Sequence, residues 1–257
     1  MLDPFRAYIK YILKSKNEYS VHSPFVYDYI TKGLMSKGSM GLNNVELFRK
    51  SLLKNHEQIE ITDFGAGSKV FKGNKRIVSK LASKAGISKK RGELLFRTVN
   101  YFKPKTILEI GTSLGISSTY MASAFQDTQV YTLEGCPVIA EIAKNNFSDF
   151  NFNNIALVVG EFEKTLPLVL KNKKIDLVYF DGNHQKEPTI NYFKQCLQAA
   201  HEDSVFIFDD IHWTRPMEDA WEIIKNHKSV TISLDTYKWG MVFFKKNRVK
   251  QHFCLRI

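Results

Sequence analysis

From residue 106 onward, short apolar runs alternate with longer segments that are apolar on one side only. The runs predict strands at 106–110, 129–133, 155–159, 175–180 and 204–208, and the segments between them predict helices near 116–126, 137–150, 162–171 and 187–200. Strands that alternate with helices are typical of a parallel sheet covered by helices on both faces. The pattern therefore predicts an α/β fold.

The hydrophobic pattern changes after the last of these strands. A helix near 216–227 is followed by apolar runs at 229–234 and 239–245, which only the short turn at 235–238 separates. So short a connection joins antiparallel strands, because parallel strands need a longer crossover. We expect seven strands in a mostly parallel sheet whose last strand is antiparallel.

The first 87 residues show helical patterns and no comparable series of strands. Asp3-Pro4 and Ser23-Pro24 are helix-start signals, and an apolar stripe follows each of them. Ser88 is expected to begin the next helix. We therefore divide the chain into a basic N-terminal helical extension and loop (1–87) and a main domain (88–257). The apolar stripes predict docking onto the main domain or onto a second subunit, as in a homodimer.

The first strand of the main domain leads into a glycine turn, and the second ends in an acid. The sequence Thr106-Ile-Leu-Glu-Ile-Gly-Thr-Ser-Leu-Gly115 is followed by Val130-Tyr-Thr-Leu-Glu134. Glycines let backbone amides approach a ligand closely, and Glu134 can accept hydrogen bonds from both hydroxyls of a ribose. This pattern predicts a nucleoside-binding crevice. Glu109, inside the strand, suits a cationic ligand better than a pyrophosphate; the alternative is an ordinary α/β turn without a ligand.

A second stretch, Ile59 to Gly67, also resembles a strand and a glycine turn. It is not followed by a second strand, and the segment 69–90 contains no acid that could bind a ribose. We interpret Asp63 to Gly73 as a loop near the pocket.

At the first glycine motif and at Glu134 the chain resembles the class I S-adenosylmethionine-dependent methyltransferases, over residues 88–245. The resemblance implies a Rossmann-like fold and S-adenosylmethionine as cofactor. It places Glu109 near the amino-acid end of the cofactor and Glu134 on its ribose. The other implied cofactor contacts are Gly111, Thr112, Ser113, Gly115 and Ser117 at the methionine part, and Gly160, Glu161 and Phe162 beside the adenine.

Acidic residues also follow the fourth and fifth predicted strands. Asp181-Gly-Asn-His184 ends the fourth, and Asp209-Asp210 ends the fifth. Carboxylates that converge repel one another unless a proton or a cation neutralises them, and Mg²⁺ prefers oxygen ligands. The pattern predicts a divalent-metal site. The alternative is that one Asp caps the following helix and another faces water.

These acids resemble the motif of the catechol-type and caffeoyl-CoA-type O-methyltransferases. The resemblance implies that Asp181, Asp209 and Asp210 hold the metal, and that Asp181 borders both the cofactor and the reacting groups. The catechol-type base is a lysine three residues after the first acid, and His184 stands there in this chain. A neutral imidazole can accept the hydroxyl proton at pH 7. His184 is thus a candidate base, with a fourth metal ligand or a helix cap as alternatives.

Charge is distributed unevenly along the chain. The net charge is +11, but residues 1–105 carry 21 basic and 8 acidic side chains, whereas residues 106–257 carry 16 and 18. Such a region attracts nucleic acid or an anionic substrate, or simply keeps the protein soluble. No apolar run is long enough to cross a bilayer, so no membrane partner is expected. Three scattered cysteines and the absence of a secretory signal favour the cytoplasm.

These observations predict methyl transfer from S-adenosylmethionine to a hydroxyl oxygen of a small molecule, with assistance from Mg²⁺ or another divalent cation. Two alternatives remain: a nucleic-acid (RNA) methyltransferase that uses the basic N-terminal region, and a non-catalytic binding protein that keeps the cofactor fold. The sequence does not identify the methyl acceptor.

Overall fold

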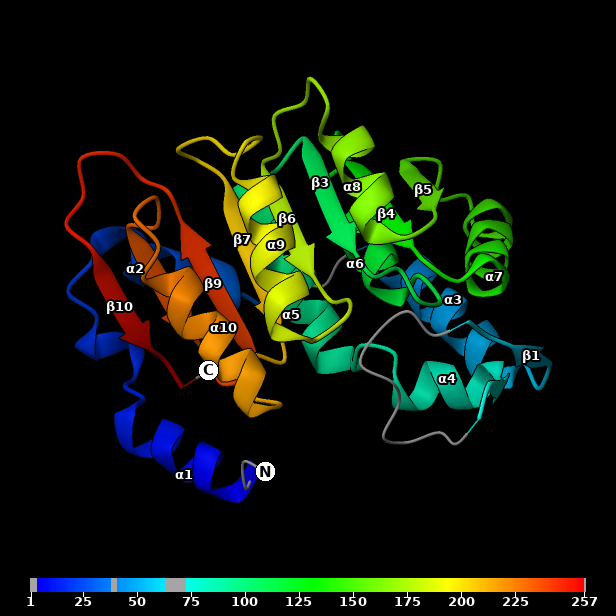
Figure 1. Cartoon of the computed structure of the whole chain (residues 1–257), viewed down its shortest axis with the longest axis horizontal. Helices are drawn as coiled ribbons and strands as arrows, with labels where there is room; N and C mark the ends of the chain where they lie inside the picture. The colour runs from blue at the N-terminus through cyan, green and yellow to red at the C-terminus, as the bar shows by residue number, and fades with distance from the viewer. Residues whose placement is uncertain (1–3, 38–40, 63–72, 257) are drawn as a thin grey trace. The chain divides into compact units, whose positions relative to one another are not determined.

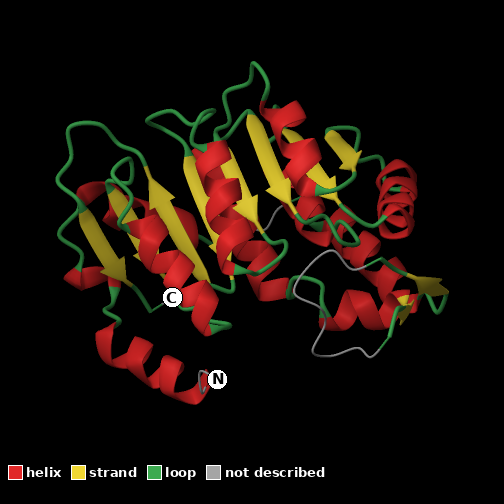
Figure 2. Ribbon diagram, viewed as in Figure 1, coloured by secondary structure: helices red, strands yellow, loops and turns green. Residues whose placement is uncertain are grey.

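The computed structural model describes residues 4–37, 41–62 and 73–256, which form helices around an eight-stranded, mostly parallel sheet (Figures 1 and 2). The chain folds as two compact units: residues 37–169, and residues 1–36 together with 170–257. The predicted boundary at residue 88 stays a prediction. Each unit is described by itself.

The unit 37–169 contains three parallel strands, β3 (Thr106–Ile110), β4 (Gln129–Glu134) and β5 (Ile155–Val159), in the order β3-β4-β5. Their bounds agree with the predicted runs, because each strand is a short apolar segment. The register places Glu109 of β3 opposite Thr132 of β4. The helices of this unit are α3 (Asn43–Lys54), α4 (Val78–Lys84), α5 (Lys89–Phe102), α6 (Ile116–Ala124), α7 (Pro137–Asp149) and most of α8 (Phe162–Leu170).

The same unit contains a small antiparallel pair, β1 (Gln58–Glu60) and β2 (Lys75–Ile77). The pair uses the apolar run that begins at Ile59, so this run does not enter the large sheet. The loop that we expected over Asp63 to Gly73 lies outside the described residues except for Gly73. Ser88 caps α5 as predicted, because its Oγ accepts a hydrogen bond from the amide of Arg91.

The second unit contains five strands in the order β10-β8-β9-β7-β6. They are β6 (Leu177–Phe180), β7 (Val205–Asp209), β8 (Ile232–Asp235), β9 (Trp239–Phe243) and β10 (Gln251–Cys254). The predicted hairpin is confirmed, since β8 and β9 are antiparallel and β9 is also antiparallel to β7. The helices are α1 (Pro4–Lys14), α2 (Pro24–Asp28), the π-helix η2 (Tyr29–Leu34), α9 (Lys186–Cys196) and α10 (Arg215–Lys225), with the 3-10 turn η1 (Glu18–Ser20).

Aromatic residues pack on both faces of β7 and β9. On one face, Phe206 contacts Phe193 of α9 and Phe208 contacts Trp221 of α10. On the other face, the ring of Phe243 packs edge-on against Tyr29 of η2. Helices therefore cover this part of the sheet on two sides, as the run of apolar residues in β7 indicated.

The eighth strand is a correction to the expected seven. β10 is parallel to β8, and its neighbour Leu255 forms a bridge with Lys16. The segment Gln251-His-Phe-Cys254 carries too few apolar residues to stand out as a strand. Its edge position explains this, because an edge strand does not need a continuous apolar run. In the described part of the chain, no helix has the length and apolar character needed to cross a membrane.

Candidate cofactor site and strand-end carboxylates

The turn after β3 is built from residues with left-handed backbone. Gly111, Ser113 and Gly115 have φ values of 105°, 49° and 80°. The amides of Gly111 and Thr112 both donate to the carbonyl of Leu133, at 3.1 and 3.0 Å. The turn is thereby tied to β4, and α6 begins directly after it at Ile116. A helix N-terminus behind a glycine turn exposes backbone N–H groups to a ligand.

Glu134 ends β4 and turns back onto this loop. Its Oε2 accepts a hydrogen bond from the amide of Ser113 at 2.8 Å, and its Oε1 accepts one from the amide of Cys136 at 2.9 Å. Two backbone donors fix the carboxylate at the end of the strand. Each carboxylate oxygen has a further lone pair, so Glu134 keeps the capacity to accept hydrogen bonds from a diol.

Glu109 is completely buried and is surrounded by hydroxyl groups. Ser117 and Ser118 of α6 donate to its two oxygens, Ser117 at 2.5 Å, and Thr132 of β4 donates to Oε2 at 2.6 Å. Burial, and to a smaller extent the charge of Glu134, raise the pKa of Glu109 to about 7 against the lowering effect of the three hydroxyls. Near neutral pH the carboxyl group of Glu109 is therefore present in both its neutral and its charged form.

The end of β5 completes this edge of the unit. Gly160 has a φ of 140°, and its amide donates to the carbonyl of Glu134 at 2.8 Å. Glu161 precedes α8 and forms an ion pair with Lys164, while Phe162 is the first residue of that helix. The unit 37–169 thus carries the ten residues predicted to contact a cofactor around β3, β4 and β5: Glu109, Gly111, Thr112, Ser113, Gly115, Ser117, Glu134, Gly160, Glu161 and Phe162. Their roles remain predictions.

The remaining predicted residues lie in the other unit, after β6 and β7. His184 Nε2 is 3.6 Å from Oδ1 of Asp181, and the imidazole packs edge-on against the ring of Trp213 at 5.5 Å. Between the pair lies Asn183, whose backbone is left-handed and whose buried Oδ1 accepts no hydrogen bond from a described residue. The loop after β6 thus places a carboxylate beside an imidazole.

Asp209 and Asp210 have partners other than a metal. The hydroxyl of Tyr179 donates to Oδ2 of Asp209 at 3.1 Å, and the amide of Asp210 donates to Oδ1 of Asp209 at 2.8 Å. Oδ1 of Asp210 is buried, and Lys238 Nζ lies 3.6 Å from it. Among the described residues, no three His, Cys, Asp or Glu side chains are grouped so as to hold a metal ion. The predicted ligands Asp181, Asp209 and Asp210 are therefore not assembled into a metal site in this structure.

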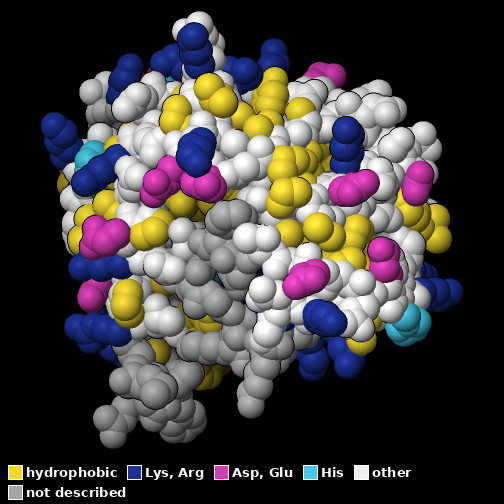
Figure 3. All heavy atoms as spheres, turned by 45° about the vertical axis from the view of Figure 1, so that its right-hand side comes forward, with side chains coloured by type: hydrophobic (Ala, Val, Ile, Leu, Met, Phe, Trp, Pro, Cys, Tyr) yellow, Lys and Arg dark blue, Asp and Glu magenta, His cyan; other side chains and the backbone are white. Residues whose placement is uncertain are grey.

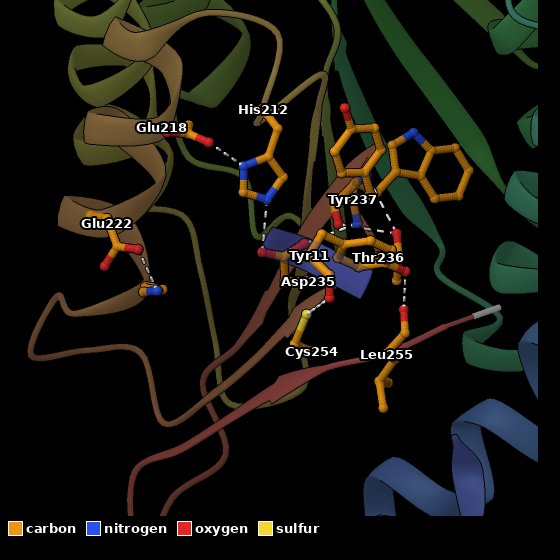
Figure 4. A network of polar contacts seen from close by, with 11 residues as sticks. Tyr11, His212, Glu218, Glu222, Asp235, Thr236, Tyr237, Cys254 and Leu255 are labelled. Carbon is orange, nitrogen blue, oxygen red and sulfur yellow. Dashed lines mark hydrogen bonds and ion pairs between the residues drawn. The ribbon is translucent and has the colours of Figure 1, made fainter. Parts of the chain in front are cut away.

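A polar network that the sequence did not indicate lies directly after the paired acids (Figure 4). His212 Nδ1 is 2.9 Å from Glu218 of α10, and Nε2 is 2.9 Å from Asp235 of β8. Its ring stacks on Tyr237, which in turn contacts Tyr11 of α1. Burial lowers the pKa of His212, but hydrogen bonds and charge from Asp235 and Glu218 outweigh this effect, so the net pKa is raised. His212 thus connects the loop after β7 to β8 and α10.

The basic side chains of the N-terminal region bear on the nucleic-acid alternative. On the face shown in Figure 3, the described Lys and Arg side chains lie among Asp and Glu side chains and form no continuous patch. Lys89 is paired with Glu46 and lies within 3.9 Å of Glu93. Arg76 is buried and donates to the carbonyl of Lys75. Nucleic-acid binding remains an untested prediction.

Part of the chain is similar in sequence to known methyltransferases. Residues 108–211 match the model of a methyltransferase domain family. A catechol O-methyltransferase of Mycobacterium tuberculosis is 30% identical over 127 residues, which cover 49% of this chain and 56% of that protein. The chain thus spans little more than half of the length of this curated relative.

Solved structures resemble the whole fold at low sequence identity. An O-methyltransferase from Bacillus cereus in complex with S-adenosylhomocysteine has a TM-score of 0.56 and 19% identity, over 86% of this chain and 97% of that one. An O-methyltransferase from Streptomyces achromogenes in complex with S-adenosylmethionine has a TM-score of 0.57 and 17% identity, over 95% and 100%. At these identities, the likenesses show the fold alone.

Proposed function

We propose that this chain is a class I methyltransferase, which transfers a methyl group from S-adenosylmethionine to a hydroxyl oxygen of a small molecule. One observation carries the proposal: Glu109 and Glu134 flank a left-handed glycine turn at the ends of β3 and β4. The carboxylate of Glu109 suits a cationic group of a ligand. The carboxylate of Glu134, which two backbone amides hold in place, suits the two hydroxyls of a ribose. S-adenosylmethionine has both, and it supplies an already electrophilic methyl group.

The residues of the unit 37–169 have the task of binding and orienting this cofactor. We assign Glu134 to the ribose and Glu109 to the cationic amino-acid end, with the turn 111–115 and Ser117 between them. Gly160, Glu161 and Phe162 border the adenine in this assignment. Because the methyl group reacts by in-line attack, alignment accounts for most of the protein's contribution to rate.

His184 is assigned the proton transfer. Its neutral imidazole accepts the proton of the acceptor hydroxyl, and Asp181, 3.6 Å away, stabilises the imidazolium that results. No step is assigned to a metal, because Asp209 is held by Tyr179 and Lys238 already places a positive charge beside Asp210.

Replacing Glu134 tests the cofactor assignment. In Glu134→Gln the carboxylate loses its charge, and one of its oxygens becomes a donor that faces a backbone N–H. Because hydrogen bonds to a charged group contribute about 1.5–3 kcal/mol, the affinity for S-adenosylhomocysteine should fall about 10- to 100-fold in calorimetry. Glu141→Gln, an exposed change on α7, is the matched control and should bind like the original protein. Equal affinities for both variants would refute the assignment.

Metal removal tests the second set of acids. From the partners of Asp209 and Asp210 we expect methyl transfer to a catechol, used as probe acceptor, to persist in EDTA. We also expect Mg²⁺ to change neither the rate nor the thermal midpoint. A rate that collapses in EDTA and returns with Mg²⁺ would mean that Asp181, Asp209 and Asp210 rearrange around a metal, as the sequence pattern predicted.

A further inference from the structure

We propose that Thr132 is a positioning residue that keeps Glu109 oriented and charged for the ammonium group of the cofactor. The inference rests on the proposed function, since it concerns the same cofactor site. It adds a residue that the glycine motif does not contain and that lies on the neighbouring strand.

The strand register brings the two side chains together. Thr132 of β4 lies opposite Glu109 of β3, and neither side chain is accessible to solvent. The hydroxyl of Thr132 donates to Oε2 of Glu109 at 2.6 Å, and its oxygen lies 2.6 Å from Oγ1 of Thr112. A hydroxyl has one hydrogen, so if Thr132 donates to Glu109, Thr112 must donate to Thr132. The chain of hydrogen bonds therefore runs from Thr112 in the glycine turn, through Thr132, to Glu109.

This direction has an electrostatic consequence. The groups that face Glu109 are the three hydroxyls of Ser117, Ser118 and Thr132, and the charge of Glu134 acts on it as well. None of them is a cation. Among the residues that the structure describes, only hydroxyl donors oppose the effect of burial, which raises the pKa of Glu109 to about 7. Each donor therefore shifts the balance between the neutral acid, which does not attract an ammonium group, and the carboxylate, which does.

The geometry separates Thr132 from an ordinary buried threonine. Thr119 of α6 is equally inaccessible, but its hydroxyl donates to the carbonyl of Ile116. Replacement of either threonine by valine removes one hydroxyl from the interior of the same unit and keeps the shape of the side chain. Only the change at position 132 removes a donor from the carboxylate.

The test is calorimetry of S-adenosylhomocysteine with Thr132→Val, Thr132→Ser, Thr119→Val and the original protein between pH 6.5 and 9.5. Loss of one donor to a charged group should raise the pKa of Glu109 by about one to two units. We therefore expect Thr132→Val to bind about tenfold more weakly at pH 7.5 and within about twofold of the original protein at pH 9.5, where Glu109 is charged in both. Thr132→Ser, which keeps the hydroxyl, and Thr119→Val should follow the original protein at each pH.

Methylthioadenosine gives a second readout. It has the nucleoside but no amino-acid end, so its affinity should be the same for Thr132→Val and the original protein at every pH. A deficit for S-adenosylhomocysteine that is constant with pH, or that methylthioadenosine shares, would show a merely structural role and overturn the inference. Failure of the original protein to bind S-adenosylhomocysteine would instead overturn the proposed function.

A further variant covers the case in which Thr132→Val does not fold. Ser118→Ala removes another donor to the same oxygen of Glu109 and should shift the pH dependence in the same direction. An unchanged pH dependence in Ser118→Ala would also count against the inference, because it would show that hydroxyl donors do not control the charge of Glu109.

Discussion

The variant Glu109→Gln is expected to stabilise the free protein above pH 7 and to weaken cofactor binding. The pKa of this acid rises from 4.5 to about 7 on folding, chiefly through burial. Between these values the folded protein binds more protons than the unfolded chain, so the stability of the original protein falls as the pH rises through this window. Above pH 7 the loss amounts to about 3 kcal/mol, since one pKa unit corresponds to about 1.4 kcal/mol.

Glutamine has nearly the same shape and cannot be charged. In urea titrations of the free protein, the free energy of unfolding of Glu109→Gln should therefore exceed that of the original protein by about 2–3 kcal/mol at pH 8. At pH 4.5 the two values should be almost equal. Its affinity for S-adenosylhomocysteine at pH 8 should fall about 10- to 100-fold, because the ammonium group loses its counter-charge. The exposed change Glu141→Gln should leave both quantities unaltered. A variant that is less stable than the original protein at pH 8 would contradict the expectation.

The second large effect is expected for Gly115→Ala. Gly115 has a φ of 80°, and a Cβ atom there would lie 2.4 Å from two ring atoms of Phe147. The ring of Phe147 stacks on Phe48, which is itself fully buried and contacts Phe152. The ring therefore has little freedom to move aside. Left-handed backbone costs an alanine about 1–2 kcal/mol, and overpacking costs about 1–3 kcal/mol more.

Gly73 offers a matched control for this substitution. Its φ is 75°, and no atom of residues 4–37, 41–62 or 73–256 lies within 4 Å of the position that its Cβ would take. Gly73→Ala should thus lower the free energy of unfolding by about 1–2 kcal/mol, and Gly115→Ala by about 2–5 kcal/mol, in urea titrations. The difference between them measures the contact with Phe147. Equal decreases in the free energy of unfolding would mean that the ring of Phe147 moves aside more easily than its packing against Phe48 indicates.

The sequence predicted well those elements that follow from the hydrophobic pattern of their own segment. β3, β4 and β5 are short apolar runs, and the β8–β9 hairpin follows from the short connection between two such runs. β10 could not be predicted in this way, because Gln251 and His252 become part of a strand only through pairing with β8. The same applies to Ile59, whose partner in the antiparallel pair is Arg76.

The residues of the candidate site differ in the same way, since some are recognised from their own segment and others only from contacts with distant segments. Glu109, Gly115 and Glu134 stand out in the sequence because turn chemistry and strand ends are local. The donors to Glu109 are not local: Thr132 is identified only once the register of β3 and β4 is known. The partners of the strand-end acids, Tyr179 and Lys238, likewise come from neighbouring strands and from the turn between β8 and β9. Such contacts determine whether the carboxylates of Asp181, Asp209 and Asp210 are neutralised without a metal ion. The spacing of residues along one segment does not reveal these contacts.

The pairing of Lys16 with Leu255 joins the segment after α1 to the segment after β10, which is far away in the sequence. The carbonyl of Cys254 accepts a hydrogen bond from the amide of Lys16, and the hydroxyl of Tyr11 donates to the carbonyl of Leu255. A nascent chain that has been extended only to residue 16 therefore still lacks the strand that α1 contacts through Tyr11 and Cys254. Proteolytic cleavage near Arg248 would break the covalent link between β9 and β10, so that α1 would remain joined to Leu255 only through hydrogen bonds.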